Sequence, residues 1–136
     1  MPKANRYFVK GQHYHLTHRC HNRSFLLKFA KDRDAYREML RKKLVEYRTP
    51  LLGYCVTSNH VHLLVTAMDE NRVSQMMDSL EGDFAQVYNL RTGKSGSFWS
   101  GRYRATAIGD QTQLWNCLAY IDLNMVRAGA VDCPSE

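Results

Sequence analysis

Long apolar runs are missing from this chain of 136 residues, and none is long enough to span a bilayer. The first twelve residues, MPKANRYFVKGQ, also lack the apolar segment and small-residue cleavage site of a signal peptide. We therefore expect no membrane association and a cytoplasmic location. The sequence has no internal repeat, low-complexity tract or obvious linker, and 44% of its residues are apolar. These features predict a single domain over residues 1–136 with an ordinary core.

Cysteines are few and widely separated. The four of them, Cys20, Cys55, Cys117 and Cys133, form no CxxC pair. This spacing argues against a zinc ribbon and against a disulfide scaffold. We expect all four to be free thiols without a metal or redox role.

Acidic residues are scarce in the first third of the chain. Residues 1–48 contain 13 Lys or Arg against 4 Asp or Glu, a local net charge of +9, whereas residues 49–90 carry −4 and the whole chain +6. A basic segment on a small domain favours a polyanionic partner such as nucleic acid. A solvated basic face would give the same count, so charge alone does not identify the partner.

Hydrophobic periodicity predicts seven secondary-structure elements. Strands are expected at 12–20, 51–57, 60–67 and 103–109, and helices at 32–48, 72–91 and 110–128. Only Ser58 and Asn59 separate the second and third strands, and because Asn tolerates a positive φ, a tight hairpin is expected there. The first six elements follow the βαββαβ order of ferredoxin-like α+β domains, an antiparallel sheet with helices on one face.

The last predicted helix has clear ends and two distinct faces. Asp110 is placed to cap its start with Gln113 three residues on, and Gly129 to end it. The residues at helical spacing divide into an apolar stripe of Leu114, Leu118, Ile121 and Met125 and a polar stripe of Gln113, Asn116, Tyr120, Asn124 and Arg127.

The stretch TSNHVHLLV, residues 57–65, places two histidines on one face of a predicted strand. Because side chains alternate along a strand, His60 and His62 share a face, and Val61, Leu63 and Val65 form the opposite, core-facing side. Two neighbouring imidazoles can bind one divalent cation. An isolated HxH is more often a pair of exposed histidines on a solvated sheet, so a third ligand and a reactive group are needed to support a metal site.

Tyr120 and Asn124 are the best candidates for that reactive group and third ligand. They lie one helical turn apart and project side by side. A phenol can attack phosphorus to form a covalent phosphotyrosine, but its pKa of about 10 means that it needs activation. A divalent metal held by two histidines and an Asn carboxamide can polarise the phosphate. A half-buried tyrosine at the edge of a core is the structural alternative.

The segments NHVHLLV, FWSGRYRA and AYIDLNMVRAG, in this order and spacing, resemble a known superfamily. The first is similar to the histidine–hydrophobe–histidine motif of HUH single-strand DNA endonucleases, and the last resembles their tyrosine helix. The chain as a whole most resembles REP-associated tyrosine transposases, from YHLTHRCHNR to VRAGAV. It departs from that family's usual pattern at Ser58 and Met125, where relatives have proline.

The resemblance implies a ferredoxin-like core with the tyrosine on a helix that packs across the sheet. It implies that His60, His62 and Asn124 bind Mg²⁺ or Mn²⁺ and that Tyr120 is the nucleophile. It further implies cleavage of single-stranded DNA near REP-type palindromes that fold as hairpins, leaving a 5′-phosphotyrosine and a free 3′-OH that can rejoin strands. Association with the nucleoid would follow. Relatives act as monomers or as homodimers that exchange tyrosine helices, and both states remain open here.

Two further segments, HRCHNR and SFWSGRYR, combine basic and aromatic residues in the way that single-strand-binding grooves do. Arg19, Arg23, Arg102 and Arg104 are expected to contact phosphates. Phe98 and Trp99 are expected to stack on bases, with core packing an equal alternative. The other four histidines, His13, His15, His18 and His21, have spacing that fits no second metal site, and we expect them to be scattered polar strand positions.

The leading hypothesis is therefore a metal-dependent single-stranded DNA endonuclease and strand transferase. One alternative is a ferredoxin-like nucleic-acid-binding module with weak or lost catalysis, and the presence of all four residues His60, His62, Tyr120 and Asn124 argues against it. A second alternative is a structural ferredoxin-like oligomer with an incidental metal. The charge of +9 on the first 48 residues argues against that one.

Overall fold

The strands and helices follow the predicted order along the chain. The computed structural model describes residues 8–127, with side chains through Leu123. The elements are β1 (His13–Arg19), the 3₁₀ turn η1 (His21–Arg23), α1 (Ala30–Glu46), β2 (Leu51–Val56), β3 (His60–Thr66), α2 (Arg72–Thr92), β4 (Arg104–Ala107) and α3 (Gln111–Arg127). Every described boundary lies within two residues of its predicted position. The proposed helix stop at Gly129 lies outside the described residues, and none of the helices within them is long and apolar enough to span a membrane.

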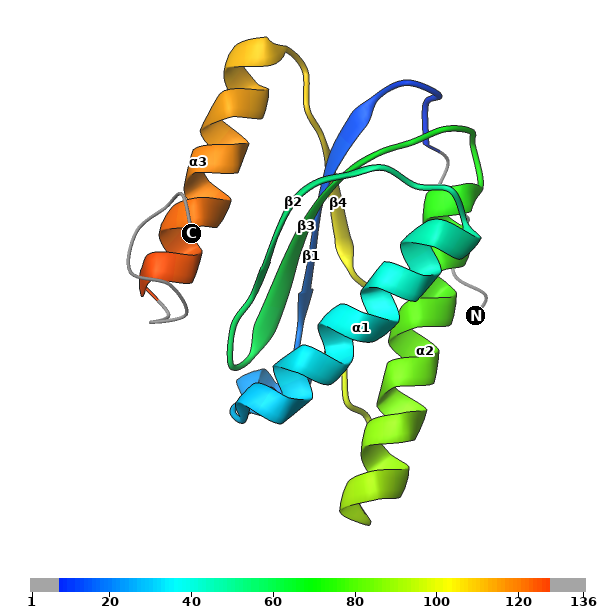
Figure 1. Cartoon of the computed structure of the whole chain (residues 1–136), viewed down its shortest axis with the longest axis vertical. Helices are drawn as coiled ribbons and strands as arrows, with labels where there is room; N and C mark the ends of the chain where they lie inside the picture. The colour runs from blue at the N-terminus through cyan, green and yellow to red at the C-terminus, as the bar shows by residue number, and fades with distance from the viewer. Residues whose placement is uncertain (1–7, 128–136) are drawn as a thin grey trace.

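The four strands form one antiparallel sheet in the order β2-β3-β1-β4. Helices α1 and α2 cover one face, and α3 stands on the other side of the sheet (Figure 1). This is the predicted ferredoxin-like α+β architecture with an additional C-terminal helix. Because helices lie on both faces, residues on both sides of the central strands are buried.

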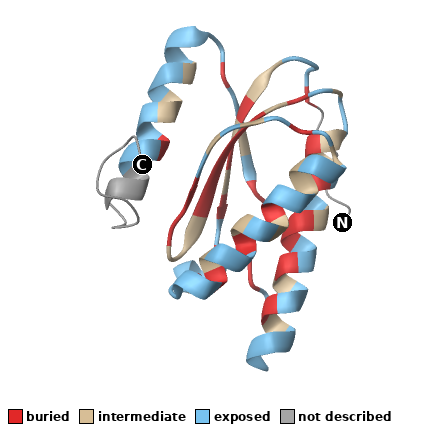
Figure 2. Ribbon diagram, viewed as in Figure 1, coloured by how far each residue is buried: buried red, intermediate tan, exposed pale blue. Residues whose placement is uncertain are grey.

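The main core lies between the sheet and helices α1 and α2. Val61, Leu63 and Val65 of β3 are all buried there, as the strand alternation predicted. Burial of each aliphatic side chain of this size contributes about 1.5–3 kcal/mol. The buried positions follow the inner sides of α1 and α2 in Figure 2. The helices supply Tyr36, Leu40, Val73, Met76, Met77, Leu80, Phe84 and Tyr88.

A second, smaller core lies between α3 and the other face of the sheet. Cys55, Leu64, Ile108 and Ile121 are buried in it, and Leu114, Cys117 and Leu118 pack against them. The apolar stripe predicted for the last helix is confirmed as far as Ile121, while the side chain of Met125 lies outside the described residues. A Cβ added to Gly53 of β2 would lie 3.0 Å from Leu118 Cδ2, so the helix depends on this glycine for its close approach. Cys20, Cys55 and Cys117 are free thiols, as expected, and Cys133 is not described.

The predicted caps and turns hold α3 and the β2–β3 hairpin in place. Asp110 Oδ1 accepts the backbone N–H of Gln113 at 2.8 Å, and Gln113 Oε1 accepts that of Gly109 at 2.6 Å. The hairpin turns at Ser58 and Asn59 as expected, but neither residue has a positive φ, so that part of the prediction was wrong. The Thr57 hydroxyl stabilises the turn instead, because it accepts the backbone N–H of His60 at 3.2 Å.

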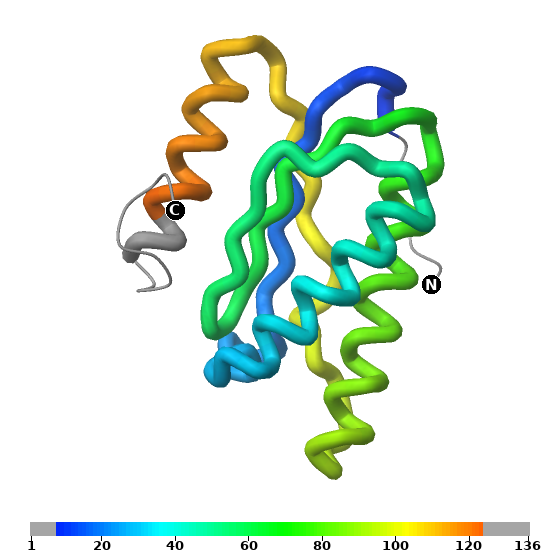
Figure 3. Tube along the Cα trace, viewed as in Figure 1, coloured from blue at the N-terminus to red at the C-terminus, as the bar shows by residue number. Residues whose placement is uncertain are grey.

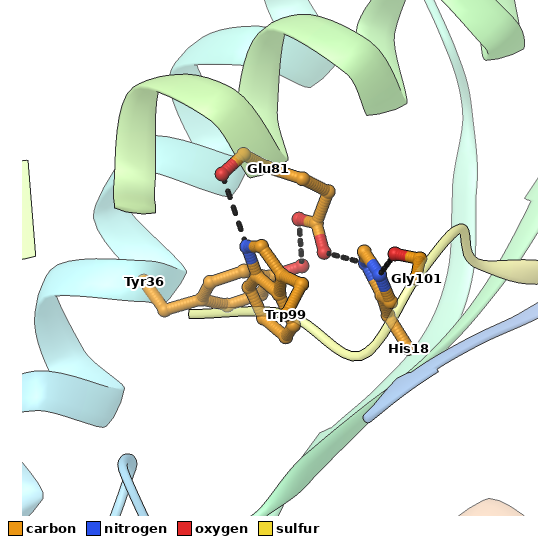
Figure 4. A network of polar contacts seen from close by, with 5 residues as sticks. All are labelled: His18, Tyr36, Glu81, Trp99 and Gly101. Atoms are coloured by element: carbon orange, nitrogen blue, oxygen red, sulfur yellow. Dashed lines mark hydrogen bonds and ion pairs between the residues drawn. The ribbon is translucent and has the colours of Figure 1, made fainter. Parts of the chain in front are cut away.

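A buried carboxylate on α2 joins the elements around the main core (Figure 4). Glu81 Oε2 lies 2.5 Å from His18 Nδ1 of β1, and Glu81 Oε1 accepts the Tyr36 hydroxyl of α1 at 3.0 Å. Its backbone carbonyl accepts the indole N–H of Trp99 at 3.0 Å, and His18 Nε2 donates to the carbonyl of Gly101 at 2.9 Å. Burial raises the pKa of the Glu81 carboxyl, an effect that the neighbouring His18 opposes.

We expect Glu81→Leu to lower the free energy of unfolding by about 3–5 kcal/mol, because His18 loses its buried partner. Urea denaturation followed by circular dichroism would measure the change. Gln86→Ala, at an exposed position of the same helix, is the matched control and should change stability by less than about 0.5 kcal/mol. An unchanged unfolding midpoint for Glu81→Leu would contradict a stabilising role for this network.

Candidate functional site

A cleft of about 790 Å³ opens between α3 and the sheet face opposite α1 and α2. Strand register explains which side chains line it. Thr17 pairs with His62 and Arg19 with His60, so these side chains share one face, and β4 continues that face because Arg104 pairs with Thr17. The full lining comprises His15, Thr17, Arg19, Arg23, His62, Ser100, Arg102, Arg104, Thr106, Ile108, Asn116, Cys117 and Tyr120.

The structure brings the predicted histidine pair and the predicted tyrosine together within one chain. The rings of His60 and His62 have centroids 4.7 Å apart, and the centroid of Tyr120 lies 5.5 Å from that of His62. Tyr120 is 48% exposed, whereas His62 is only 4% exposed. The interpretation of the motif as two exposed histidines on a solvated sheet is therefore wrong for His62. The side chain of Asn124, the predicted third ligand, lies outside the described residues.

The β2–β3 hairpin fixes the tautomer of His60. Its Nδ1 lies 2.8 Å from Asn59 Oδ1 and 2.9 Å from Thr57 Oγ1. An amide oxygen can only accept, so Nδ1 carries the hydrogen. The lone pair of the neutral ring is then on Nε2, the nitrogen available for a metal ion.

His15 of β1 belongs to the same cluster, although its spacing in the sequence predicted only a scattered polar strand position. His15 Nε2 lies 3.0 Å from His62 Nδ1, the two rings stack with centroids 5.2 Å apart, and the His15 centroid lies 6.4 Å from that of Tyr120. The signal was present in the sequence. A ferredoxin-like sheet places its first and third strands side by side, so an outward-facing histidine on the first strand meets the HxH of the third.

The site keeps its imidazoles neutral. Burial, together with the nearby His60, His15 and Arg19, lowers the pKa of His62 to about 3. Burial also lowers the pKa of His15 and, with a contribution from Arg19, that of His60. Metal ions bind the unprotonated ring, so this environment suits a cation site.

One orphaned atom supports the fit of a metal ion to these residues. Nε2 of His62 is buried and has no hydrogen-bond partner among the described residues. A buried polar nitrogen without a partner is costly, and a cation at this position would satisfy it. Residues 8–127 contain no cluster of three or more His, Cys, Asp or Glu side chains arranged to hold a metal ion. Two imidazoles would therefore need a ligand of another kind to complete such a site.

All four predicted arginines line the cleft. Arg19 comes from the end of β1 and Arg23 from η1, while Arg102 lies just before β4 and Arg104 begins it. The β1 and β4 segments are tied together because Ser100 N–H donates to the Arg19 carbonyl at 2.8 Å. Guanidinium groups from two distant parts of the sequence thus form one positive surface around His62 and Tyr120, suited to phosphate groups.

The core-packing alternative for Phe98 and Trp99 is confirmed, and the base-stacking role predicted for them is wrong. Phe98 is 2% exposed and Trp99 is 8% exposed, and both pack against Phe84 in the main core. The Trp99 ring also stacks on His18 with centroids 4.4 Å apart. An isolated antiparallel bridge between Cys20 and Trp99 ties this segment to the end of β1. The two rings anchor the segment that carries Arg102 and Arg104.

Comparison with known proteins gives a consistent result. The family model described as IS200-like transposase matches residues 8–124. The chain is similar to the structure of a REP-associated tyrosine transposase bound to a REP hairpin, with a TM-score of 0.75 and 22% identity over 99% of this chain and 79% of that one. It is also similar to a candidate transposase from Deinococcus radiodurans R1, with a TM-score of 0.61 and 20% identity over 85% and 92% of the two chains. No curated protein matches the sequence.

We expect His15→Leu to weaken Mn²⁺ binding about tenfold, because His62 loses the ring nitrogen that hydrogen-bonds its Nδ1 and orients its ring. His15→Gln places an amide oxygen in the same region and should retain most of the affinity. Calorimetric titration would measure the affinities, and ¹⁵N NMR of the metal-free variants would report the His62 tautomer. Wild-type affinity and an unchanged tautomer in His15→Leu would contradict this role.

Proposed function

Because this chain belongs to the IS200-like transposase family, we propose that it is a metal-dependent endonuclease and strand transferase for single-stranded DNA. Family membership indicates a transposase-type, DNA-binding function, and the contents of the cleft support the finer proposal. The observation that carries it is the position of Tyr120, whose ring lies 5.5 Å from that of His62 in a cleft lined by four arginines.

In the proposed reaction, the Tyr120 hydroxyl oxygen attacks the scissile phosphorus. A bond forms from Tyr120 Oη to phosphorus as the bond to the 3′ oxygen breaks. The phenol proton is lost, and the departing oxygen takes up a proton to become a 3′-OH. The result is a 5′-phosphotyrosine, and attack by a 3′-OH on this linkage reverses the step and joins strands.

His60 and His62 would hold a Mg²⁺ or Mn²⁺ ion, with Asn124 as the third protein ligand. When bound, the ion would supply Lewis-acid polarisation of the phosphate and fix its orientation. The chain's own contribution is to keep both rings neutral and aligned, His60 through Thr57 and Asn59 and His62 through His15. Part of the site is thus prepared before any ligand arrives.

The DNA substrate we propose is a single strand beside a hairpin-forming palindrome. Arg19, Arg23, Arg102 and Arg104 would hold its phosphates in the cleft. The similar REP-associated tyrosine transposase is bound to a REP hairpin, which supports a substrate of this kind. The proximity of Tyr120 and His62 within one chain supports an active site that does not need a second copy. A homodimer that exchanges α3 is the alternative.

We expect wild-type protein with Mn²⁺ to form a covalent adduct with a labelled hairpin oligonucleotide that carries a single-stranded flank. Tyr120→Phe should abolish the adduct because it removes the only atom that forms the phosphotyrosine bond. Denaturing gel electrophoresis would detect the product, and Tyr54→Phe, an exposed tyrosine of β2, is the matched control. If a broad panel of hairpins gave no adduct, a nucleic-acid-binding module without catalysis would be the better assignment.

We also expect His60→Ala to reduce metal affinity and cleavage together, because one of the two imidazole ligands is lost. Calorimetric titration with Mn²⁺ and single-turnover cleavage would measure the two effects. His13→Ala is the matched control. His13 lies on the same face of β1 as His15, but its side chain hydrogen-bonds Thr66 and does not line the cleft. Normal metal binding in His60→Ala would show that the ligand assignment is wrong.

A further inference from the structure

The loop between η1 and α1 leaves two large aromatic rings in solvent. Its sequence is SFLLKF, residues 24–29, and four of its six residues are bulky and apolar. Leu27 is fully buried and Leu26 packs against the main core, whereas Phe25 is 63% exposed and Phe29 is 58% exposed. The two leucines therefore attach the loop to the core, and the two phenylalanines do not contribute to it.

The loop is held in one conformation by contacts at its base. Leu27 N–H donates to the Ser58 carbonyl at 2.9 Å, and Lys28 N–H donates to the Phe25 carbonyl at 3.2 Å. The Arg33 guanidinium donates to the carbonyls of Leu27 at 2.9 Å and Lys28 at 2.6 Å. The exposed rings thus project from a fixed base, which lowers the entropy cost of binding a ligand.

Phe29 stabilises the start of helix α1 less than a capping residue would. It is the N-cap residue of α1 and makes no side-chain cap bond. A Ser, Asp or Asn at this position would stabilise the helix by about 1 kcal/mol. An exposed aromatic ring in place of a cap breaks a local rule without an evident gain in folding, a pattern typical of functional positions.

The surroundings of these rings are strongly positive. The Nζ atoms of Lys28 and Lys31 lie 5.7 and 5.8 Å from the Phe29 ring centroid. Of the two acids in the first turns of α1, Asp32 is buried in an ion pair with Arg91 of α2, and the exposed Asp34 pairs with Arg37. Both acids therefore have cationic partners other than the two lysines. Aromatic rings among cations are the combination that binds single-stranded nucleic acid.

The loop is continuous with the cleft. Arg23, which lines the cleft, lies two residues before Phe25, and its carbonyl accepts the Asn59 side-chain amide at 3.5 Å. The loop thus lies against the hairpin that carries His60, as the trace in Figure 3 also shows. A single-stranded DNA that leaves the cleft past Arg23 would therefore reach Phe25 and Phe29 next.

We propose that Phe25 and Phe29, with Lys28 and Lys31, form a second contact for single-stranded DNA outside the cleft. Unpaired bases stack on the two rings, and the lysines hold the adjoining phosphates. This inference rests on the proposed function for the identity of the strand, but it concerns binding alone and needs neither metal nor the tyrosine. It also supplies the base-stacking role that the burial of Phe98 and Trp99 leaves unfilled.

The test is a binding measurement on Tyr120→Phe protein in the presence of EDTA, where no cleavage occurs. Fluorescence anisotropy with a labelled oligo-dT would give the affinity. Phe29→Leu keeps an apolar side chain but removes the π face and should weaken binding about tenfold, since each stacked base contributes substantially to affinity. Phe29→Tyr should bind as wild type does, and Phe25→Leu should behave like Phe29→Leu.

Three further measurements separate stacking from other effects. Val45→Ala removes an exposed apolar residue at the opposite end of α1 from Phe29 and should leave the affinity unchanged. Lys28→Gln and Lys31→Gln should each reduce the slope of log affinity against log salt concentration by about one. Sedimentation of the wild type and Phe29→Leu would reveal whether the rings join two copies of the chain.

Wild-type affinity for oligo-dT in both Phe25→Leu and Phe29→Leu would overturn the inference. The inference would also fail if the wild type self-associates, Phe29→Leu does not, and this difference accounts for the change in DNA binding. Its failure is distinguishable from failure of the proposed function. Absence of a covalent adduct together with weakened oligo-dT binding in the leucine variants would reject the proposed catalysis and support the second DNA contact. A Tyr120-dependent adduct together with unchanged oligo-dT binding in those variants would support the catalysis and reject the second contact.

Discussion

The carboxylate of Glu81 is the constraint on which the arrangement of the cleft depends. It lies fully inside the main core, where an unpaired charge would be very costly, so its partners must stay in place. Its partners, His18 and Tyr36, belong to β1 and α1. His18 also bonds the Gly101 carbonyl of the segment before β4, and Trp99 of that segment donates to the Glu81 backbone carbonyl. That segment begins with two rings buried against α2 and continues, three to five residues later, with Arg102 and Arg104 in the cleft. A buried polar network on one side of the sheet thereby positions the cations on the other.

The two faces of the sheet divide structure from chemistry along the same strands. On β3, the odd-numbered residues 61, 63 and 65 fill the main core, and His60 and His62 face α3. On β1, His18 points into the polar network while His15 points into the cleft. Because side chains alternate with a period of two, a shift of one residue in register would exchange these roles and bury the wrong set. The antiparallel pairing of β1 with β3 is therefore what assembles the histidine cluster.

Helix α3 closes the cleft through a small contact area. Among its described side chains only Ile121 is fully buried, and the close approach of Leu118 to Gly53 brings the helix against β2. The helix is fixed at its start by the bonds among Gly109, Asp110 and Gln113. Tyr120 is carried on a helix with few core contacts, so its distance from His62 depends on a few residues of the second core. A lightly packed helix is also the kind of element that can move when a substrate enters.

The sequence alone determined the order of the elements, because hydrophobic periodicity is local and strong over residues 12–127. It also determined the candidate set of His60, His62, Tyr120 and the four arginines, because the reactivity and charge of these side chains follow from residue type.

Only the tertiary structure decided which of the other polar and aromatic residues belong to the candidate site. His15 was one of four scattered histidines until strand pairing placed it beside His62. Phe98 and Trp99 had the composition of a stacking platform but were buried by their contacts with α2, while Phe25 and Phe29 were left in solvent once Leu26 and Leu27 had filled the adjacent core. Composition does not distinguish these outcomes, because burial is set by which neighbours the fold brings to each side chain, and those neighbours are distant in sequence.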